Sequence, residues 1–283
     1  MPSDSVSRYY DRNTRRFLLM GSGRGSRSIH RELWGPGVGS ASEAAGSIDR
    51  MVADEIARLL PGARPLILDF GCGVGGTLFH LAERFSGARL HGITVSRRQV
   101  EIAERLAGKL GCADRCSFLL GDFQSARLDV RADVIVAVES FAHSATADAF
   151  LANAAMHLRE GGCLILADDF LASPEDSLDD RQRLRVEEFQ AGWRVPAVCT
   201  TESLVAAAAA RGLTAERNVD LTSHTRPGSR VRDRLVAALS PLAARVGLAR
   251  FPFYGNMIGG HALQVGLREG FLRHQLLVFR RRG

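Results

Sequence analysis

Apolar residues in the middle of the chain follow two patterns that alternate along the sequence. Short apolar runs rich in strand-forming residues are typical of buried β-strands. They lie at 65–70, 89–94, 116–121, 133–138 and 162–168. Segments whose apolar residues recur at helical spacing lie at 77–85, 97–110 and 147–158. Strands that alternate with helices favour a parallel, doubly wound α/β sheet.

The two ends of the chain extend this core. Ser42 is a suitable N-cap for a helix that runs to about Leu60. A charged insertion at 169–198 is followed by a helix at 201–211 and a strand at 214–220. An insertion at 221–270, with an amphipathic helix at about 229–247, then leads to a last strand at 271–280. The sequence predicts four parts: an N-terminal helical lid (1–60), an α/β core (61–220), a cap insertion (221–270) and the final strand of the core sheet (271–283).

Composition narrows the class of protein. The 283 residues are 46% hydrophobic and 24% charged, which is ordinary for a globular protein. No apolar run approaches the roughly 20 residues of a transmembrane helix, and the first residues lack a signal-peptide pattern. The five cysteines are scattered without a C-x-x-C pair. We expect a reduced, cytoplasmic protein without a stable membrane anchor.

Positive charge is concentrated at the two ends. Residues 1–40 carry a net charge of +4 and residues 221–283 carry +9, so 41–220 carry −7 within a total of +6. Such a field favours an anionic ligand or an acidic surface. The alternative is compositional bias, because Lys109 is the single lysine and arginine replaces lysine throughout.

A glycine-rich turn follows the first predicted strand. Asp69 stands two places before Gly71, and Cys72, Gly73 and two further glycines complete the pattern D-x-G-C-G-x-G-G ahead of a helix. Glycine lets backbone approach a ligand closely, and the free N–H groups of a helix N-terminus favour an anionic group such as a carboxylate. A tight turn that binds nothing is the alternative.

This pattern resembles the first motif of the class I S-adenosylmethionine (SAM)-dependent methyltransferases. The resemblance covers about 65–220 and the last strand. It implies a Rossmann-like seven-stranded sheet of order 3-2-1-4-5-7-6, with the last strand antiparallel and helical cap insertions. It also implies SAM as the cofactor, held in part by Asp69, Gly71, Cys72 and Gly73.

Two later strand ends extend the resemblance. The T-x-S-x-x-Q pattern that contains Thr94, Val95 and Gln99 is similar to that of sterol and geranyl diphosphate C-methyltransferases and cyclopropane fatty acid synthases. It assigns ribose binding to Thr94 and Gln99, where many relatives have an acidic residue. After the third strand, the resemblance implies an adenine site formed by Gly121, Asp122 and Phe123.

Glu139 and His143 follow the fourth predicted strand. Their spacing resembles the E-x-x-x-H segment of sterol C-24 methyltransferases and the glutamate-bearing segment of prenyl diphosphate C-methyltransferases. An alkene that attacks a sulfonium methyl leaves a carbocation, which nearby negative charge stabilises. Glu139 is the candidate to stabilise that cation and take the final proton, and His143 is a second candidate base. Alternatively, Glu139 binds SAM groups and His143 is structural.

Aromatic and imidazole side chains are candidates for the walls of a lipophilic chamber, although core packing would also use them. The candidate substrate-binding residues are Tyr9, Tyr10, His30, Trp34, Phe170, Trp193, Phe253 and Tyr254. The pair Asp168–Asp169 could hold Mg²⁺, but a third oxygen ligand is missing. The sequence therefore favours a solvated strand end there.

The function expected from these features is methyl transfer from SAM to a small lipophilic metabolite of secondary metabolism. C-methylation of an isoprenoid alkene, either a prenyl diphosphate or a terpenoid, is the first expectation. A diphosphate would bring Mg²⁺ and would contact Arg16, Arg27 and Arg31. The alternatives are an O- or N-methyltransferase of a polyketide, quinone or alkaloid, with His143 as base, and a SAM-binding cyclase. A nucleic-acid methyltransferase would suit the basic pI, but no nucleic-acid-binding module supports one. A homodimer is left open.

Overall fold

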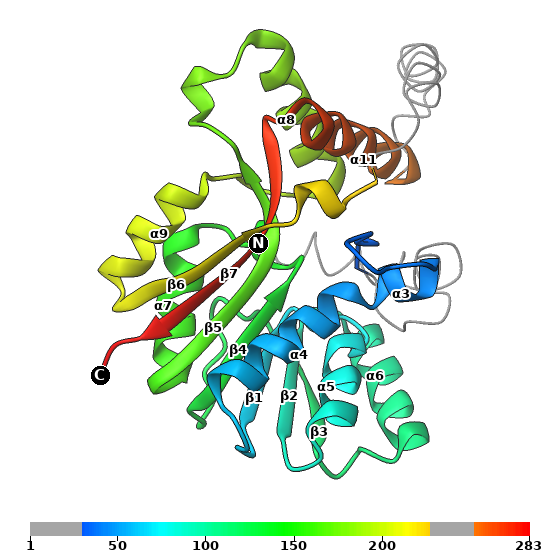
Figure 1. The fold of residues 1–283 in the computed structure, drawn as a ribbon, viewed down its shortest axis with the longest axis vertical. Helices are drawn as coiled ribbons and strands as arrows, with labels where there is room; N and C mark the ends of the chain where they lie inside the picture. The colour runs from blue at the N-terminus through cyan, green and yellow to red at the C-terminus, as the bar shows by residue number, and fades with distance from the viewer. Residues whose placement is uncertain (1–29, 227–251) are drawn as a thin grey trace.

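Seven strands form one mixed sheet in the order β3-β2-β1-β4-β5-β7-β6 (Figure 1). The computed structural model describes residues 30–226 and 252–283, except the side chains of Pro252 and Phe253. Strands β1 to β5 are parallel, and β7 runs antiparallel to both β5 and β6. The predicted strand order and the antiparallel last strand are confirmed. The strands are β1 (Leu66–Phe70), β2 (Arg89–Thr94), β3 (Cys116–Leu120), β4 (Ala132–Val138), β5 (Leu158–Leu171), β6 (Leu213–Asp220) and β7 (Leu272–Arg281).

Helices cover both faces of the sheet (Figure 1). Alternate residues of β4 point to opposite faces, so Val134 and Val136 pack in one apolar cluster and Ile135 and Ala137 in another. The first cluster lies under α4 (Ser47–Leu59), α5 (Gly76–Arg84) and α6 (Arg97–Leu110). The second lies under α7 (Ala147–His157) and α9 (Thr201–Ala210). This is the doubly wound arrangement that the alternating pattern predicts.

The helix expected from Ser42 to Leu60 is divided into two. Ser40, not Ser42, caps α3 (Ala41–Ala45), because Glu43 completes a reciprocal capping box with it. Gly46 separates α3 from α4. Since α4 packs on the sheet, this part of the range predicted as a lid covers the core. Residues 30–40 form no helix, and Arg31 in this segment contacts Glu139 after β4 and Asp169 near the carboxyl end of β5.

A cap lies above the carboxyl ends of the strands (Figure 1). It contains α8 (Asp180–Trp193) and α11 (Pro252–Glu269), which cross at glycines. A Cβ added to Gly192 would overlap the carbonyl oxygen of Gly255 and lie 2.7 Å from Cα of Gly259. The two helices therefore touch backbone to backbone. The amphipathic helix predicted at about 229–247 lies outside the described residues.

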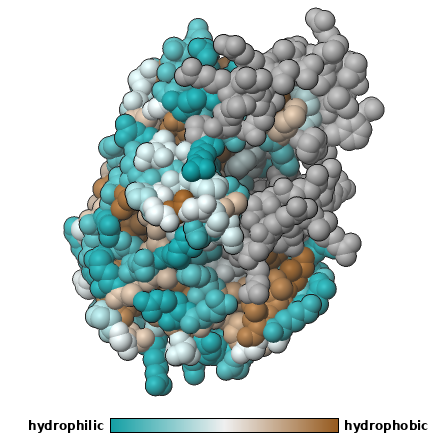
Figure 2. All heavy atoms as spheres, turned by 45° about the vertical axis from the view of Figure 1, so that its right-hand side comes forward, coloured by the Kyte–Doolittle hydropathy of each residue, from teal (hydrophilic) through white to brown (hydrophobic). Residues whose placement is uncertain are grey.

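The face in Figure 2 is largely hydrophilic, with a hydrophobic area along its lower right border. Among the described residues, no helix combines the length and the apolar character that a membrane crossing requires. Short 3₁₀ turns complete the described chain: η1 (Phe141–His143), η2 (Glu175–Ser177) and η3 (Thr222–His224).

Candidate functional site

The glycine-rich turn lies where the strand order reverses, next to both β2 and β4. Backbone N–H groups of Gly71 and Cys72 both donate to the carbonyl of Ile93, at 2.9 and 3.0 Å, and fasten the turn to β2. Gly71 has φ +86°, and a Cβ there would overlap that of Ser140. Gly73 has φ +55°, but a Cβ there would meet no atom of the described residues within 4 Å. This space, beside the helix N-terminus, fits a ligand that approaches the backbone.

Asp69 precedes this turn and is buried, with 3% of its surface exposed. Burial, assisted by the negative charge of Asp49, raises the pKa of the Asp69 carboxyl to about 8. Asp49 comes from α4 and accepts a 2.7 Å hydrogen bond from the hydroxyl of Thr77, which also contacts His30 Nε2 at 2.8 Å. Two buried carboxyls near the turn suit a cationic partner such as the ammonium group of SAM.

The residues predicted to hold ribose and adenine come together at the ends of β2 and β3. The Thr94 hydroxyl donates to Gln99 Oε1 at 2.5 Å, and Gly121 N–H donates to the Thr94 carbonyl at 2.9 Å. Val95 and Gly121 are half-buried, as is Asp122, whose Oδ1 accepts from Gln124 N–H. Phe123 stacks on Phe70 with ring centroids 5.7 Å apart. Ser96, the serine of the T-x-S-x-x-Q pattern, caps α6 and accepts from the Gln99 N–H.

Glu139 and His143 lie directly after β4. Glu139 adopts φ +50°, a left-handed backbone that is strained for a residue with a side chain. Its Oε1 accepts a 2.9 Å hydrogen bond from the backbone N–H of Arg31. Burial lowers the pKa of His143, although the Arg194 carbonyl and the Glu139 charge act in the opposite direction. His143 Nδ1 lies 3.5 Å from that carbonyl.

Asp168 and Asp169 are buried, which corrects the prediction of a solvated strand end. The strand is longer than predicted, because β5 pairs with β7 as far as Leu171. Arg31 forms two hydrogen bonds to Asp169, at 3.0 and 2.7 Å, and His274 Nδ1 adds a third at 3.0 Å. Burial favours the neutral form of Asp169, but Arg31 and His274 outweigh it and lower its pKa to about 2.

Asp168 is in the opposite electrostatic situation. Burial, and then the charge of Asp169, raise its pKa to about 8, although backbone N–H groups of Ala142 and Asp169 donate to it. Arg31, which a diphosphate was expected to contact, is already paired. No group of three or more metal-ligating side chains occurs among residues 30–226 and 252–283. The described residues therefore form no evident Mg²⁺-binding site.

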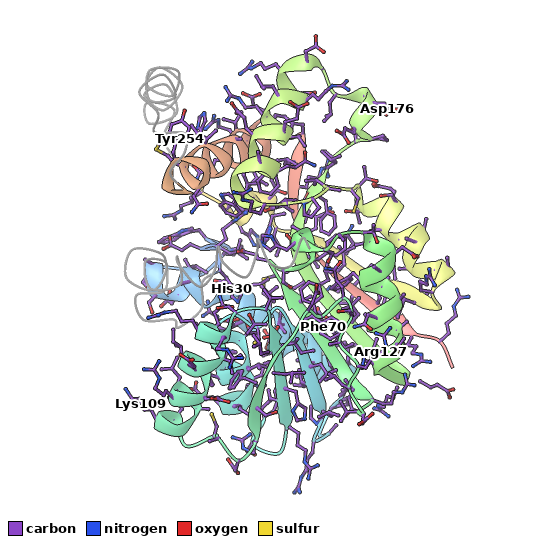
Figure 3. All side chains as sticks on the ribbon, turned by 180° about the vertical axis from the view of Figure 1, so that it is seen from behind. His30, Phe70, Lys109, Arg127, Asp176 and Tyr254 are labelled. Atoms are coloured by element: carbon purple, nitrogen blue, oxygen red, sulfur yellow. The ribbon has the colours of Figure 1, made fainter. Side chains whose placement is uncertain are left out.

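The predicted substrate-binding residues occupy different places. His30 and Trp34 belong to the segment 30–40 that precedes α3; Figure 3 labels His30 and, nearer the sheet centre, Phe70. Trp193 lies on α8 and donates to the Asn256 carbonyl at 3.2 Å. Phe170 is fully buried and stacks on Phe141 with centroids 6.0 Å apart, so it supports the site from within the core. Half-buried Tyr254 lies on α11, whereas Tyr9, Tyr10, Arg16, Arg27 and the side chain of Phe253 lie outside the described parts.

The sequence reasoning missed Asp49, Thr77, Ser140 and His274. One signal was available for Asp49: it shares the apolar stripe of α4 with Val52 and Ile56, where a charged residue is out of place. Ser140 donates to the Phe70 carbonyl at 2.5 Å and ties the end of β4 to the glycine-rich turn. This contact joins residues 70 positions apart and leaves no local pattern.

Comparisons with known proteins agree with this geometry. A family model described as a methyltransferase domain matches residues 68–164. Methyltransferase GfsG of Streptomyces halstedii is 34% identical over 66% of this chain and 64% of its own length. The 27-O-demethylrifamycin SV methyltransferase of Amycolatopsis mediterranei (strain S699) is 31% identical over 71% of each chain. The match with methyltransferase GfsG spans slightly under two thirds of the length of that relative.

Solved structures show the same fold. The [4+2]-cyclase SpnF is 25% identical, with a TM-score of 0.71 over 99% of this chain and 97% of its own. The geranyl diphosphate C-methyltransferase from Streptomyces coelicolor A3(2) is 18% identical, with a TM-score of 0.70 over 99% and 97% of the two chains. The resemblance read from the motifs is confirmed: the chain belongs to the class I SAM-dependent methyltransferases.

Proposed function

We propose that this protein transfers the methyl group of SAM to a hydroxyl oxygen of a small lipophilic metabolite. The observation that carries the proposal is the half-buried His143 beside Glu139 at the end of β4, above the glycine-rich turn. C-methylation is the first expectation from the sequence. The arrangement around Arg31 and His143 favours O-methylation instead.

His143 has the properties of a general base. Its lowered pKa keeps the imidazole neutral at pH 7, so it can accept a proton. A carbonyl can only accept a hydrogen bond, so Nδ1 facing the Arg194 carbonyl is the protonated nitrogen, and Nε2 is the basic one. The Glu139 charge raises the pKa of His143, which means that it stabilises the imidazolium formed when a hydroxyl gives up its proton.

SAM supplies an electrophilic methyl group when it is bound. Three features support the fit of this chain to SAM. No described atom lies within 4 Å of a Cβ at Gly73, no side chain of the described residues caps the start of α5, and the Asp69 carboxyl is buried. In this proposal, Thr94 and Gln99 hold its ribose and Asp122 holds its adenine. The residues of the chain then need to orient one hydroxyl and remove its proton.

Two further points support an uncharged hydroxylated acceptor. Arg31 is paired with Asp169, so it is not available to neutralise a diphosphate. The negative charge of Glu139, which also acts on His143, disfavours an anionic acceptor next to it. Among the relatives, the 27-O-demethylrifamycin SV methyltransferase is named for an O-methylation.

C-methylation of an alkene is the second candidate, and Glu139 is the observation that favours it. A carboxylate fixed by a backbone hydrogen bond next to a methyl donor would stabilise a carbocation. In that case Glu139, rather than His143, would be essential for turnover.

The test incubates the protein with SAM and two panels of acceptors. One panel contains phenols and hydroxylated macrocycles, and the other contains sterols and geranyl and farnesyl diphosphates. We expect a mass gain of one methyl and stoichiometric S-adenosylhomocysteine (SAH) with a member of the first panel. His143→Ala should lower kcat about 10²–10⁴-fold, the usual loss on removal of a general base, while His80→Ala on α5 serves as control.

Three results would contradict the proposal. Methylation confined to the alkenes, with Glu139→Gln as the inactivating change, would establish the second candidate. Rearrangement of an acceptor without SAH formation would indicate a SAM-binding cyclase. Absence of SAH binding by the folded protein would remove the methyltransferase activity altogether.

A further inference from the structure

A layer of polar side chains is buried between two apolar clusters on one face of the sheet. Asp169 and His274 face each other across β5 and β7, and Arg31 closes over them from the N-terminal segment. On the core side, Ala167 and Leu276 belong to the cluster under α4. On the cap side, Leu171 and Leu272 belong to the cluster with α8 and α11. Asp169 and His274 are 5% and 0% exposed.

Buried ionic groups in such a layer must satisfy one another, because water cannot. Arg31 makes a two-point contact with Asp169, and His274 occupies a further position on the same carboxylate. Two parallel N–H···O bonds fix the plane of the guanidinium, which a single contact does not. The position of the Arg31 backbone is therefore fixed relative to β5.

Within the described parts of the chain, the Glu139 carboxylate accepts one hydrogen bond, from the Arg31 backbone N–H to Oε1 at 2.9 Å. Beyond Arg31, the segment is fastened again. Leu33 N–H donates to the Ala44 carbonyl at 3.0 Å, and Trp34 N–H donates to the His224 carbonyl at 2.6 Å. The guanidinium of Arg226 lies 3.7 Å from the centre of the Trp34 ring. Segment 30–35 is thus held at both ends.

We propose that Arg31, fixed by Asp169 and His274, is a positioning residue that sets the carboxylate of Glu139 toward His143. This inference rests on the proposed function, since it assigns Glu139 the task of stabilising the His143 imidazolium. Two of the links are direct contacts, from Asp169 to the Arg31 side chain and from the Arg31 N–H to Glu139 Oε1. The third link is electrostatic, because the Glu139 charge acts on His143. The hydrogen bond from Arg31 N–H also helps to hold the strained backbone of Glu139, because a residue with a left-handed backbone persists only when its surroundings fix it.

The test uses Asp169→Asn, which keeps the shape of the side chain and removes its charge, and Arg31→Lys, a milder change that retains the positive charge. The matched control is Asp148→Asn. Asp148 also binds an arginine at two points, Arg211 at 2.8 and 2.6 Å, but on the exposed surface. Hydrogen exchange of the Arg31 amide is measured first, because it needs no acceptor.

We expect that amide to exchange at least about tenfold faster in Asp169→Asn and in Arg31→Lys than in the unmodified protein, and unchanged in Asp148→Asn. The affinity for SAH should stay within about threefold of the original, because the glycine-rich turn is untouched. With the acceptor identified in the panel, kcat should fall between about 10- and 100-fold, the scale of a small misplacement of a reacting group.

A double-mutant cycle separates positioning from simple structural damage. If Arg31 acts through Glu139, Asp169→Asn should lower kcat less than about twofold once Glu139→Gln is present. An equal loss in both backgrounds would overturn the inference, and so would unchanged exchange of the Arg31 amide. If no acceptor is methylated but the amide exchange rises as expected, the proposed function fails while the structural link from Asp169 to Glu139 stands.

Discussion

Three glycines with similar backbone angles offer a graded test of the glycine-rich turn. Gly71 (φ +86°), Gly73 (φ +55°) and Gly37 (φ +80°) all have left-handed backbones, but their surroundings differ. A Cβ at Gly71 would overlap Ser140 Cβ and lie 3.0 Å from its Oγ. A Cβ at Gly73 or Gly37 would meet no atom within 4 Å in the part of the chain that the structure describes. Replacement by alanine therefore adds strain at all three positions and a collision at one.

The magnitudes follow from these geometries. A left-handed alanine costs about 1–2 kcal/mol, and an overpacked contact adds about 1–3 kcal/mol. Gly37→Ala should therefore lower stability by about 1–2 kcal/mol and Gly71→Ala by about 2–5 kcal/mol. In a chain of this size, each kcal/mol lowers Tm by roughly 2 °C, which predicts a loss of about 2–4 °C and about 4–10 °C respectively. Scanning calorimetry measures both.

Gly73→Ala should behave like Gly37→Ala in stability and differ in ligand binding. If SAH lies against Gly73, the added methyl enters its space and lowers its affinity about tenfold or more in titration calorimetry, while Gly37→Ala binds normally. The reasoning would be refuted in two ways. Equal melting of Gly71→Ala and Gly37→Ala would show that Ser140 yields without cost, and full SAH affinity in Gly73→Ala would place the cofactor elsewhere.

Further predictions concern charge and the cap. The pKa of Asp69 is about 8 without ligand, so SAH affinity should rise by up to about tenfold per pH unit between pH 6 and 8, and binding should release a proton. In titration calorimetry, Asp69→Asn should abolish both the pH dependence and the proton release. The pKa of Asp169 lies at about 2, below its ordinary value of 3.8. Its contribution of about 2 kcal/mol to the free energy of unfolding should therefore be complete above pH 4 and lost as pH falls toward 2. Urea unfolding of Asp169→Asn should not show this loss. Gly192→Ala should destabilise the protein by about 3 kcal/mol, because its Cβ meets the backbone of Gly259. The control Gly108→Ala in α6 should be neutral or stabilise by up to about 1 kcal/mol. A comparable loss in both variants would contradict the close contact of α8 with α11.

The strand order and the cofactor motifs could be predicted because they depend on short segments. Short apolar runs, a glycine turn after β1 and a capped helix after β2 are each encoded within about ten residues. The positions predicted to bind SAM, Thr94, Gln99 and Gly121, came together at neighbouring strand ends for the same reason. Parallel strands place their carboxyl ends at one edge, so local motifs add up to a site.

The contacts around Arg31 could not be predicted in this way. Arg31 and Asp169 are 138 residues apart, and Arg31 and Glu139 are 108 apart, so no periodicity relates them. The wrong prediction for Asp168 and Asp169 has a related cause. Whether a carboxyl at a strand end is solvated depends on where the partner strand stops, and β7 continues beside β5 to Leu272. Net charge did not reveal that Arg31 was already neutralised.

The glycine crossing of α8 and α11 has a consequence for how the cap could change. Helices in contact through their backbones are already at the closest spacing that sterics permit, so no substitution at Gly192 or Gly259 can draw them nearer. Any added side chain there acts as a spacer that drives the helices apart. Moving the two cap helices apart would thus take a single replacement at the crossing, whereas filling the space around them would require bulk introduced elsewhere along either helix.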